Sequence, residues 1–431
     1  MINPGIETLY NLYSTNPVIT TDSRDCPRGS IFFALKGDNF NGNCFALNAL
    51  ENGCSIAVID EEEFYIEDGR HILVSNVLVS LQKLANFHRR KFTIPVIGIT
   101  GTNGKTTTKE LISSVLSQKF NTHFTKGNFN NHIGVPLTLL QLTSKHEMAI
   151  IEMGANHPGE IGELSKIAEP DYGIITNIGK AHLEGFGSYE IVIRTKNELF
   201  GFIRSKHGKL FVNQTNELLM RLSEGIERIL YGMEKVKVNP EQSSPLLELI
   251  YKKSESNEIV RTNLIGKYNL ENIQAAVCIG IFFGVSDDKI INAIKNYQPT
   301  NNRSQVLKTQ KNTLILDMYN ANPTSMAAAI TEFQSSGFSN KVAIIGDMKE
   351  LGEFAEKEHK TILNLFERKL FSRLICIGEV FTKFNDKYPQ IEFYPTTEVA
   401  LEQIALKPIT NSYILLKGSR SMKLEILLTE L

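Results

Sequence analysis

The sequence is poor in cysteine. Its 431 residues include five cysteines, scattered along the chain without a CxxC pair: Cys26, Cys44, Cys54, Cys278 and Cys376. Zinc sites and disulfide frameworks need cysteines at characteristic spacings, so neither kind of site is expected. Reduced, mostly buried thiols are the simpler interpretation.

The sequence also lacks an excess of charge of one sign. It has 46 Lys and Arg residues against 47 Asp and Glu residues, which gives a formal net charge of −1. A general affinity for nucleic acid or another polyanion is therefore not expected, and any basic site must be local.

No targeting or membrane segment is recognisable. Residues 1–14 contain no basic region followed by an apolar run, so no secretory signal is expected. The longest apolar segment, residues 275–285, is too short and too interrupted by glycine to span a bilayer. We therefore expect a soluble, cytoplasmic protein with no membrane partner.

The length and the pattern of elements predict three α/β domains, at residues 1–92, 93–298 and 299–431. In the first, strand-like runs precede an amphipathic helix at residues 77–90. The second opens with a strand, a glycine loop and a helix, and its polar run at residues 239–244 is expected to be a loop. In the third, strand-like and helical runs alternate, which predicts a parallel, doubly wound sheet.

The most informative stretch is residues 95–108, PVIGITGTNGKTTT. An apolar strand-like run leads through glycines to Lys105 and Thr106, and a helical pattern follows. In a phosphate-binding loop, glycines let backbone N–H groups surround phosphate oxygens, lysine reaches the terminal phosphates, and threonine binds Mg²⁺. Only the end of the usual pattern matches, because its first glycine would fall at Ile99. The alternative is an ordinary glycine turn before a helix.

Further polar residues follow the other predicted strands. Glu152 ends an apolar strand-like run, where a nucleotide's metal would lie at the carboxyl edge of a parallel sheet. His182 follows another such run and is either a metal ligand at the same edge or a structural histidine. Asn269 and Asn272 open a very apolar helix, a position at which asparagine is usually a cap. These residues indicate an ATP-using enzyme with Mg²⁺ and a cleft between domains.

The motifs also carry a family resemblance. The loop at residues 101–106, GTNGKT, resembles the phosphate loop of the Mur ligase family, in which the early glycine is also missing. The family pattern continues at Glu152, His182, Asn269, Asn272, Arg303 and Asp317. Four strings are most similar to the members that join D-alanyl-D-alanine to UDP-N-acetylmuramoyl-tripeptide; they are NNHIGVP at 130–136, EMGANHPGE at 152–160, YNANPTSM at 319–326 and KGSR at 417–420.

The resemblance implies a fold and a reaction. It implies a UDP-sugar-binding domain, a central ATP-binding domain with a mainly parallel sheet, and a C-terminal Rossmann-like domain that binds D-Ala-D-Ala and nucleotide. It implies an ATP- and Mg²⁺-dependent amide ligase that forms an acyl phosphate and releases ADP and phosphate. The product would be the pentapeptide precursor of peptidoglycan, and the enzyme would be a monomer.

The resemblance also implies residue roles. Lys196 falls where the family has a carbamylated lysine, although the residue could instead be a solvated helix lysine. The implied catalytic residues are Lys105, Glu152, His182, Lys196 and Arg303, and the implied metal ligands are Thr106, Glu152, His182 and Lys196. The implied nucleotide-binding residues are Gly101, Thr102, Asn103, Gly104, Lys105, Thr106, Thr107, Asn269, Asn272, Arg303 and Asp317. The implied substrate-binding residues are Asp22, Ser23 and Arg24 for the UDP-sugar, and Asn320 and Asn322 for D-Ala-D-Ala.

Some alternatives stay open at this stage. Family members often have histidine where this chain has Tyr268, and serine where it has Met318. Asp22, Ser23 and Arg24 are also ordinary turn residues. Other amide ligases of the superfamily, which act on a different muramyl peptide or on folate, are the second candidate, and a nucleotide-binding regulator without catalysis is the third. The sequence does not distinguish diaminopimelate from lysine in the tripeptide.

Overall fold

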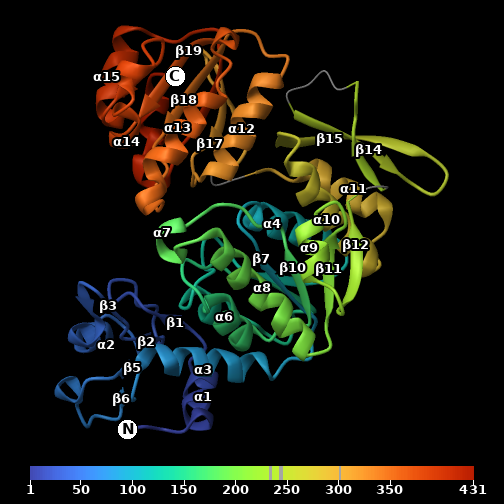
Figure 1. Ribbon diagram of the computed structural model, residues 1–431. Helices are drawn as coiled ribbons and strands as arrows, with labels where there is room; N and C mark the ends of the chain where they lie inside the picture. Colours follow the sequence, from blue (N-terminus) through green and yellow to red (C-terminus); the bar gives the residue numbers. More distant parts are fainter. Residues whose placement is uncertain (233–234, 242–245, 300–301) are drawn as a thin grey trace.

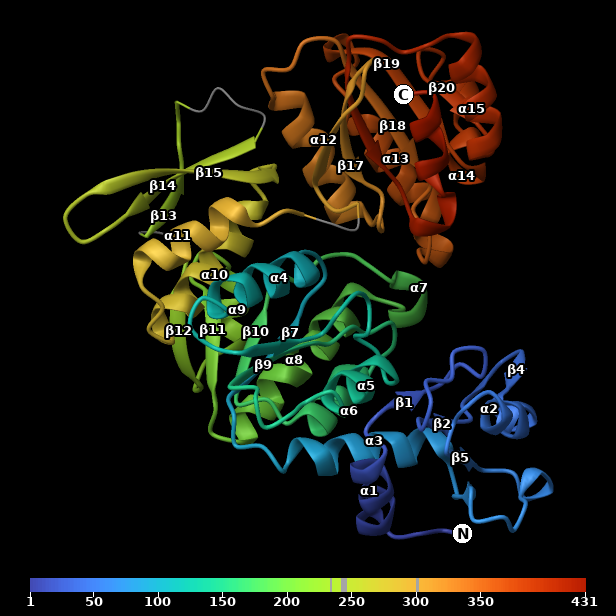
Figure 2. The ribbon, with the colours of Figure 1, turned by 180° about the vertical axis from the view of Figure 1, so that it is seen from behind.

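The computed structural model consists of three α/β domains that follow one another along the chain (Figure 1). It describes residues 1–232, 235–241, 246–299 and 302–431. The central domain lies between the other two in both views (Figures 1 and 2). Of the run predicted to be a loop, residues 242–244 lie outside the described residues.

The N-terminal domain is built on a four-stranded parallel sheet with the order β1-β2-β5-β6. The strands and helix predicted in this domain are confirmed, and α3 is capped by Asn76, whose side chain accepts a hydrogen bond from the Val79 N–H. The elements are α1 (Ile6–Thr15), β1 (Ile19–Thr20), β2 (Ile31–Phe33), β3 (Lys36–Gly37), β4 (Phe40–Asn41), α2 (Ala46–Glu51), β5 (Ile56–Ile59), β6 (His71–Leu73) and α3 (Val77–Arg89).

Helix α3 joins this domain to the central one. Its buried His88 Nε2 lies 2.9 Å from the Leu142 carbonyl, and Arg89 Nε donates to the Ala168 carbonyl at 3.1 Å. Both partners belong to the central domain. Because buried polar groups are costly when unpaired, these bonds fix α3 against that domain.

The central domain contains a six-stranded parallel sheet, β12-β11-β10-β7-β9-β8, and a three-stranded antiparallel sheet, β13-β14-β15. Its strands are β7 (Val96–Thr100), β8 (Thr122–Phe124), β9 (Met148–Glu152), β10 (Tyr172–Ile175), β11 (Lys209–Asn213), β12 (Glu227–Tyr231), β13 (Val236–Val238), β14 (Leu246–Lys252) and β15 (Asn257–Ile265). Its helices are α4 (Lys105–Leu116), α5 (Gly134–Leu139), α6 (Glu160–Ala168), α7 (Leu183–Phe186), α8 (Tyr189–Ser205), α9 (Glu217–Leu222), α10 (Asn269–Phe282) and α11 (Asp287–Asn296).

The order of the central strands explains why the predicted site residues meet. Strand β7 leads into the glycine loop and lies between β9, which ends at Glu152, and β10, which precedes the loop that carries His182. Because the three strands are parallel, their carboxyl ends lie at the same edge of the sheet. The β7 and β9 strands are fully buried, as their continuous apolar sequences predict.

The C-terminal domain has a six-stranded sheet with the order β16-β17-β21-β18-β19-β20. The predicted parallel, doubly wound arrangement holds for all strands but β16, which pairs antiparallel with β17. The four residues between β16 and β17 allow a hairpin but are too few for a parallel crossover. The elements are β16 (Gln305–Lys308), β17 (Thr313–Asp317), α12 (Pro323–Ser335), β18 (Lys341–Gly346), α13 (Ala355–Leu365), β19 (Phe371–Ile377), α14 (Glu379–Thr382), β20 (Glu392–Tyr394), α15 (Thr397–Leu406) and β21 (Tyr413–Lys417).

Replacing Asn312 with alanine is expected to lower the free energy of unfolding of the C-terminal domain by about 2 kcal/mol. Asn312 is buried in the β16–β17 turn, where its amide donates to the carbonyls of Ile409 and Leu431 at 2.7 Å and its oxygen accepts from Ser412 N–H. Alanine would leave these buried groups unpaired. Urea unfolding measures the effect, with the exposed neighbour Gln310→Ala as the matched control; equal stability of the two variants would refute the prediction.

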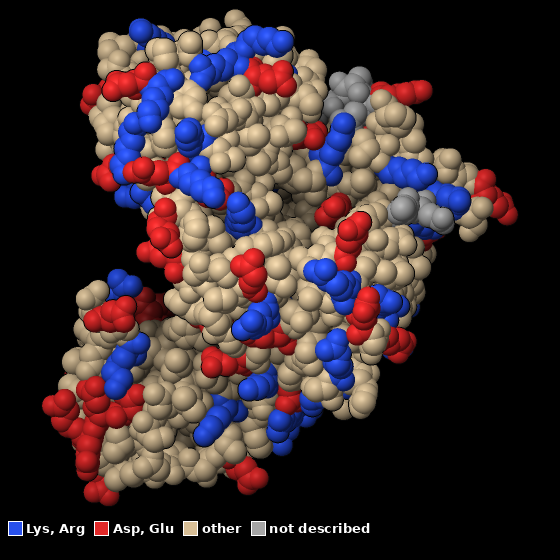
Figure 3. All heavy atoms as spheres, viewed as in Figure 1, with Lys and Arg blue, Asp and Glu red and all other residues tan. Residues whose placement is uncertain are grey.

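The structure can be compared with the sequence for membrane-spanning segments, cysteine pairing and charge distribution. No helix among the described residues has the length and apolar character needed to cross a membrane. All five cysteines are free; Cys54 and Cys376 are buried, and Cys44 is exposed. On the face shown in Figure 3, basic and acidic side chains are intermixed over the central domain.

Candidate functional site

A cavity of about 1560 Å³ is lined by residues of all three domains. Helix α3 contributes one wall, the glycine loop and the ends of β9 and β10 contribute the floor, and the C-terminal domain contributes the residues after β17. The predicted site residues that line the cavity are Thr102, Asn103, Gly104, Lys105, Thr106, Thr107, Glu152, His182, Asn269, Asn272, Arg303, Asp317, Asn320 and Asn322.

Five predicted site residues do not line this cavity among the described residues. Gly101 lies at the start of the glycine loop, and Lys196 is buried on α8. Asp22, Ser23 and Arg24 lie in the N-terminal domain and are not among the residues that line the cavity. Asp22 accepts two hydrogen bonds from the Arg24 guanidinium, at 2.9 and 2.7 Å, which lowers the Asp22 pKa to about 2.

The glycine loop has the backbone geometry that its sequence requires. Gly101 and Gly104 have φ values of +146° and +79°, which side-chain-bearing residues rarely adopt. A Cβ at Gly101 would collide with the Thr176 hydroxyl, and one at Gly104 would lie 2.6 Å from Asn272 Oδ1. The loop therefore packs too closely against its neighbours to accept any other residue at these two positions.

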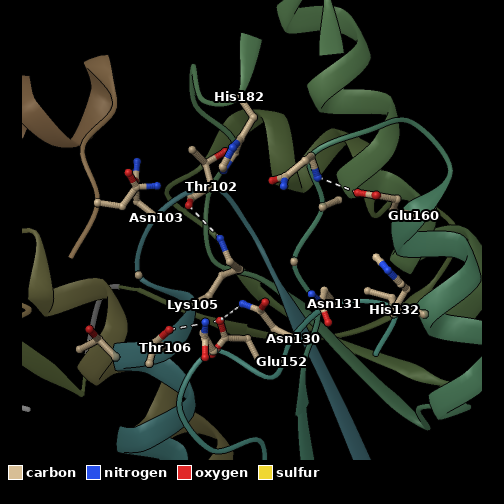
Figure 4. A pocket seen from close by; sticks show the side chains of 18 of the residues that line it. Thr102, Asn103, Lys105, Thr106, Asn130, Asn131, His132, Glu152, Glu160 and His182 are labelled. Atoms are coloured by element: carbon tan, nitrogen blue, oxygen red, sulfur yellow. Dashed lines mark hydrogen bonds between the residues drawn. The ribbon is translucent and has the colours of Figure 1, made fainter. Parts of the chain in front are cut away.

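Lys105 opens α4 and folds back across the loop. Its Nζ donates to the Thr102 carbonyl at 3.0 Å (Figure 4) and to the Gly101 carbonyl at 2.8 Å. Burial lowers the pKa of Lys105 to about 8, against the attraction of Glu152 and together with the repulsion of Arg303. The ammonium is thus desolvated at a helix N-terminus, an arrangement that favours a bound anion such as phosphate.

Glu152 has one oxygen that is hydrogen-bonded and one that is not. Its Oε1 accepts from Thr106 Oγ1 at 3.1 Å and from Asn130 Nδ2 at 2.8 Å (Figure 4). Its Oε2 is buried, lies 3.4 Å from Lys109 Nζ, and has no hydrogen-bond donor among the described residues. Mg²⁺ in nucleotide sites is commonly held by one or two carboxylates together with phosphate oxygens, so Glu152 and Thr106 fit this ion.

His182 lies on the other side of Lys105 from Glu152 in Figure 4. Its Nδ1 is 2.5 Å from Glu350 Oε2 of the C-terminal domain, and this interaction lowers the pKa of Glu350. The described residues contain no group of three or more His, Cys, Asp or Glu side chains that could hold a metal ion. A metal shared by Glu152, His182 and Lys196 therefore stays a prediction.

Lys196 is not a solvated helix lysine. It lies on the inner face of α8 with 2% of its surface exposed, and its Nζ is 5.8 Å from the centre of the Phe186 ring. Burial and, next, the nearby Lys105 lower the pKa of Lys196 to about 7, although Glu160 and Glu198 act in the opposite direction. Near neutral pH, a substantial fraction of this amine is therefore uncharged.

The interpretation of Asn269 and Asn272 as helix caps is wrong. The N-cap of α10 is Tyr268, and both asparagines are buried within the helix. Asn269 donates to the Ile265 carbonyl and accepts from Asn272 Nδ2, while Asn272 Oδ1 accepts from Thr108 Oγ1 on α4. The pair thus fixes α10 against the helix that follows the glycine loop.

The C-terminal domain brings two charged groups to the cavity. Asp317 forms an ion pair with the buried Lys417, with 2.5 Å between Oδ2 and Nζ. The Arg303 guanidinium lies 3.6 Å from the centre of the Tyr319 ring, and its buried Nε has no hydrogen-bond partner among the described residues. An unpaired guanidinium N–H at a cavity wall is well placed to bind an anionic ligand.

Asn322 connects the C-terminal domain to the glycine loop. Its Oδ1 caps α12 by accepting from the Ser325 N–H, and its Nδ2 donates to Asn103 Oδ1 at 2.8 Å. Nearby, Lys180 of the central domain pairs with Glu358 of α13 at 2.9 Å. These contacts hold the residues after β17 against the phosphate loop.

Three residues of this site were not singled out from the sequence. Lys109 lies four residues after Lys105, a helical spacing that could have placed both on neighbouring turns of one face. Asn130 lies in the NNHIGVP string, where its polar side chain was a signal for a possible contact in the site. Glu350 carries no sequence signal, because its place beside His182 depends on how two domains meet.

Comparison with known proteins identifies the family. Residues 17–96 match the catalytic domain of the Mur ligase family, residues 99–280 match the Mur ligase middle domain, and residues 302–420 match the Mur ligase glutamate ligase domain. The UDP-N-acetylmuramoyl-tripeptide–D-alanyl-D-alanine ligase of Bacillus subtilis (strain 168) is 32% identical over 426 residues, which cover 96% of this chain and 92% of that protein.

Solved structures agree over almost the whole chain. A crystal structure of MurF from Acinetobacter baumannii superposes with a TM-score of 0.84 and 30% identity, covering 95% of this chain and 92% of that one. MurF ligase from Thermotoga maritima, in complex with ADP, superposes with a TM-score of 0.85 and 26% identity, covering 96% of this chain and 97% of that one. With three successive domains matched and the expected loop lining the cavity, this chain belongs to the Mur ligase family.

Proposed function

We propose that this chain is an ATP-dependent amide ligase that joins D-alanyl-D-alanine to UDP-N-acetylmuramoyl-tripeptide. The product is the UDP-linked pentapeptide precursor of peptidoglycan. The observation that carries the proposal is a single cavity, lined by all three domains, in which Lys105 and the Thr106–Glu152 pair face the same space. The full-length similarity to a relative with this activity in its name supports the choice of substrates.

The first chemical step activates a carboxylate. A carboxylate is a poor acyl donor, so the terminal phosphoryl group of ATP is transferred to the tripeptide carboxylate, which gives an acyl phosphate and ADP. Lys105 binds the phosphates and offsets the negative charge that spreads over them during transfer. Thr106 and Glu152 would hold Mg²⁺, which adds positive charge at the same place when bound.

The second step forms the amide. The free amine of D-Ala-D-Ala attacks the acyl carbon, the amine loses a proton, and the tetrahedral intermediate expels phosphate. Asn320 and Asn322 hold this substrate at the start of α12. The Asn103–Asn322 hydrogen bond keeps that helix start beside the phosphate loop, and such positioning supplies much of the rate in reactions of several substrates.

The other predicted roles follow the three domains. In the central domain, residues 93–298, Asn272 contacts adenine and Asn269 supports it. In the C-terminal domain, residues 299–431, Arg303 contacts the phosphates and Asp317 the ribose hydroxyls. The N-terminal domain, residues 1–92, binds the UDP-sugar, with Asp22, Ser23 and Arg24 near the diphosphate.

Lys196 is proposed to act as a carbamate. The Lys196 ammonium first loses a proton. The uncharged amine then attacks CO₂, an N–C bond forms as a C=O π bond opens, and a second proton leaves, so that a carbamate anion replaces the cation. The low pKa of Lys196 provides the uncharged amine at neutral pH, and burial protects the product from water. A carbamate beside Lys105 gives a second anionic group to the cation-rich site.

Phosphate release tests the function. With ATP and Mg²⁺, we expect release only when both UDP-muramoyl-tripeptide and D-Ala-D-Ala are present, because the acyl phosphate needs the first substrate and turnover needs the second. Tripeptides that end in diaminopimelate or in lysine are compared in parallel. Release with a free amino acid but not with D-Ala-D-Ala would assign the chain to another ligase of the family.

A further inference from the structure

Lys109 is a completely buried lysine next to the predicted metal ligand. It lies on α4, one helical turn after Lys105, and none of its surface is exposed. Its Nζ is 3.4 Å from Glu152 Oε2, and neither atom has a hydrogen-bond partner among the described residues. Its Nζ lies 6.0 Å from the centre of the Phe124 ring.

Because Lys109 and Glu152 are both buried, their charges depend on each other. An isolated buried ammonium or carboxylate is very costly, so each of the two charges requires the other. The 3.4 Å separation without a hydrogen bond leaves Glu152 Oε2 buried beside Lys109 Nζ with no hydrogen-bond donor among the described residues. The single negative charge of Glu152 is therefore already balanced before a metal ion arrives.

The surroundings add further positive charge. Lys105 interacts electrostatically with both Glu152 and Arg303, and Lys196 in turn interacts with Lys105. These positive groups oppose the binding of a divalent cation beside Glu152. The phosphates of a nucleotide supply the negative charge that removes this repulsion.

We propose that Lys109 is a positioning residue that balances Glu152, so that Glu152 binds a divalent cation only together with a nucleotide. The proposal rests on the proposed use of ATP. Under this proposal, the divalent cation and the nucleotide enter the site together as one complex. The same lysine holds the Glu152 side chain in place before a ligand binds.

Binding of Mn²⁺, followed by electron paramagnetic resonance, tests this role without turnover. The full-length protein is used in bicarbonate-free buffer, so that Lys196 stays an amine. Without nucleotide, wild type is expected to bind Mn²⁺ weakly, and Lys109→Met is expected to bind it at least about tenfold more tightly, since one facing positive charge is gone. Lys109→Arg keeps the charge and is expected to bind as weakly as wild type.

Two controls separate the role from a loss of structure. Lys109→Met/Glu152→Gln removes both charges, so it is expected to recover thermal stability relative to Lys109→Met while losing the tighter Mn²⁺ binding. Lys145→Met, an exposed lysine, is expected to match wild type in both measurements. If Lys109→Met does not fold, Lys109→Gln replaces it as the neutral variant.

Two results would overturn the inference. One is unchanged or weaker Mn²⁺ binding by the folded neutral variants without nucleotide. The other result needs no variant: the wild-type protein binds ADP, but its affinity for Mn²⁺ is the same with and without ADP. A protein that binds no ADP at all would instead refute the proposed function. The two failures can be told apart, because Mn²⁺ binding by wild type and the Lys109 variants is also compared without nucleotide.

Discussion

Substitution of Lys105 with alanine is expected to reduce phosphate release by at least about a thousandfold. The Lys105 ammonium is the cation that crosses the glycine loop, and it is desolvated at the N-terminus of α4. Alanine would remove the charge that offsets the transferring phosphoryl group. The measurement is phosphate release with saturating ATP, Mg²⁺, UDP-muramoyl-tripeptide and D-Ala-D-Ala.

A matched control makes this loss interpretable. Lys145→Ala changes an exposed lysine of the same domain, so its activity and melting temperature are expected to equal those of wild type. Lys105→Ala should also retain its fold, because Nζ contacts only carbonyls of the neighbouring loop. Activity of folded Lys105→Ala within tenfold of wild type would show that another group neutralises the phosphates.

Substitution of Lys196 with alanine is expected to reduce turnover by about a hundredfold or more and to be partly reversed by a small carboxylic acid such as acetate. Alanine removes the carbamate and leaves space on the inner face of α8. An added carboxylate can then supply the missing negative charge near Lys105. The measurement is phosphate release by Lys196→Ala over a series of acetate concentrations.

The specificity of the rescue is the decisive comparison. Acetate is expected to leave Lys105→Ala inactive, since that variant lacks a cation, and removal of bicarbonate is expected to slow wild type but not Lys196→Ala. Full activity of Lys196→Ala without acetate would refute the carbamate. A loss that no carboxylic acid reverses would instead assign Lys196 a role as a buried amine.

Much of the fold could be predicted from local sequence. Continuous apolar runs predicted β7 and β9, and alternating strand and helix patterns predicted the doubly wound C-terminal sheet. The GTNGKT string predicted the glycine loop and the start of α4, because positive φ angles and a helix N-terminus are properties of a few consecutive residues. The antiparallel strand β16 was not predicted, because it joins β17 through a short turn and so departs from the alternation of strand and helix in the rest of the domain.

The site itself was only partly predictable. The sequence placed Lys105 and Glu152 at the carboxyl edge of one sheet, since parallel strands bring their ends together. The nucleotide-binding role that the resemblance implies for Asn269 and Asn272 stays a prediction. Only the alternative of helix caps is wrong, because the two side chains bond to the Ile265 carbonyl, to each other and to Thr108 of α4. The local sequence pattern indicates where a helix begins, but it does not indicate which face of that helix packs against another helix.

The family, the order of the three domains and the phosphate loop could all be predicted from the sequence alone, because each is recognised by short motifs or by the local alternation of strands and helices. The tertiary structure was needed to show that Lys109 lies beside Glu152, that Lys196 is buried, and that His182 contacts Glu350. Each of these observations depends on residues that are distant from one another along the chain. Their burial and charge balance arise from packing between helices and domains, which no local pattern records.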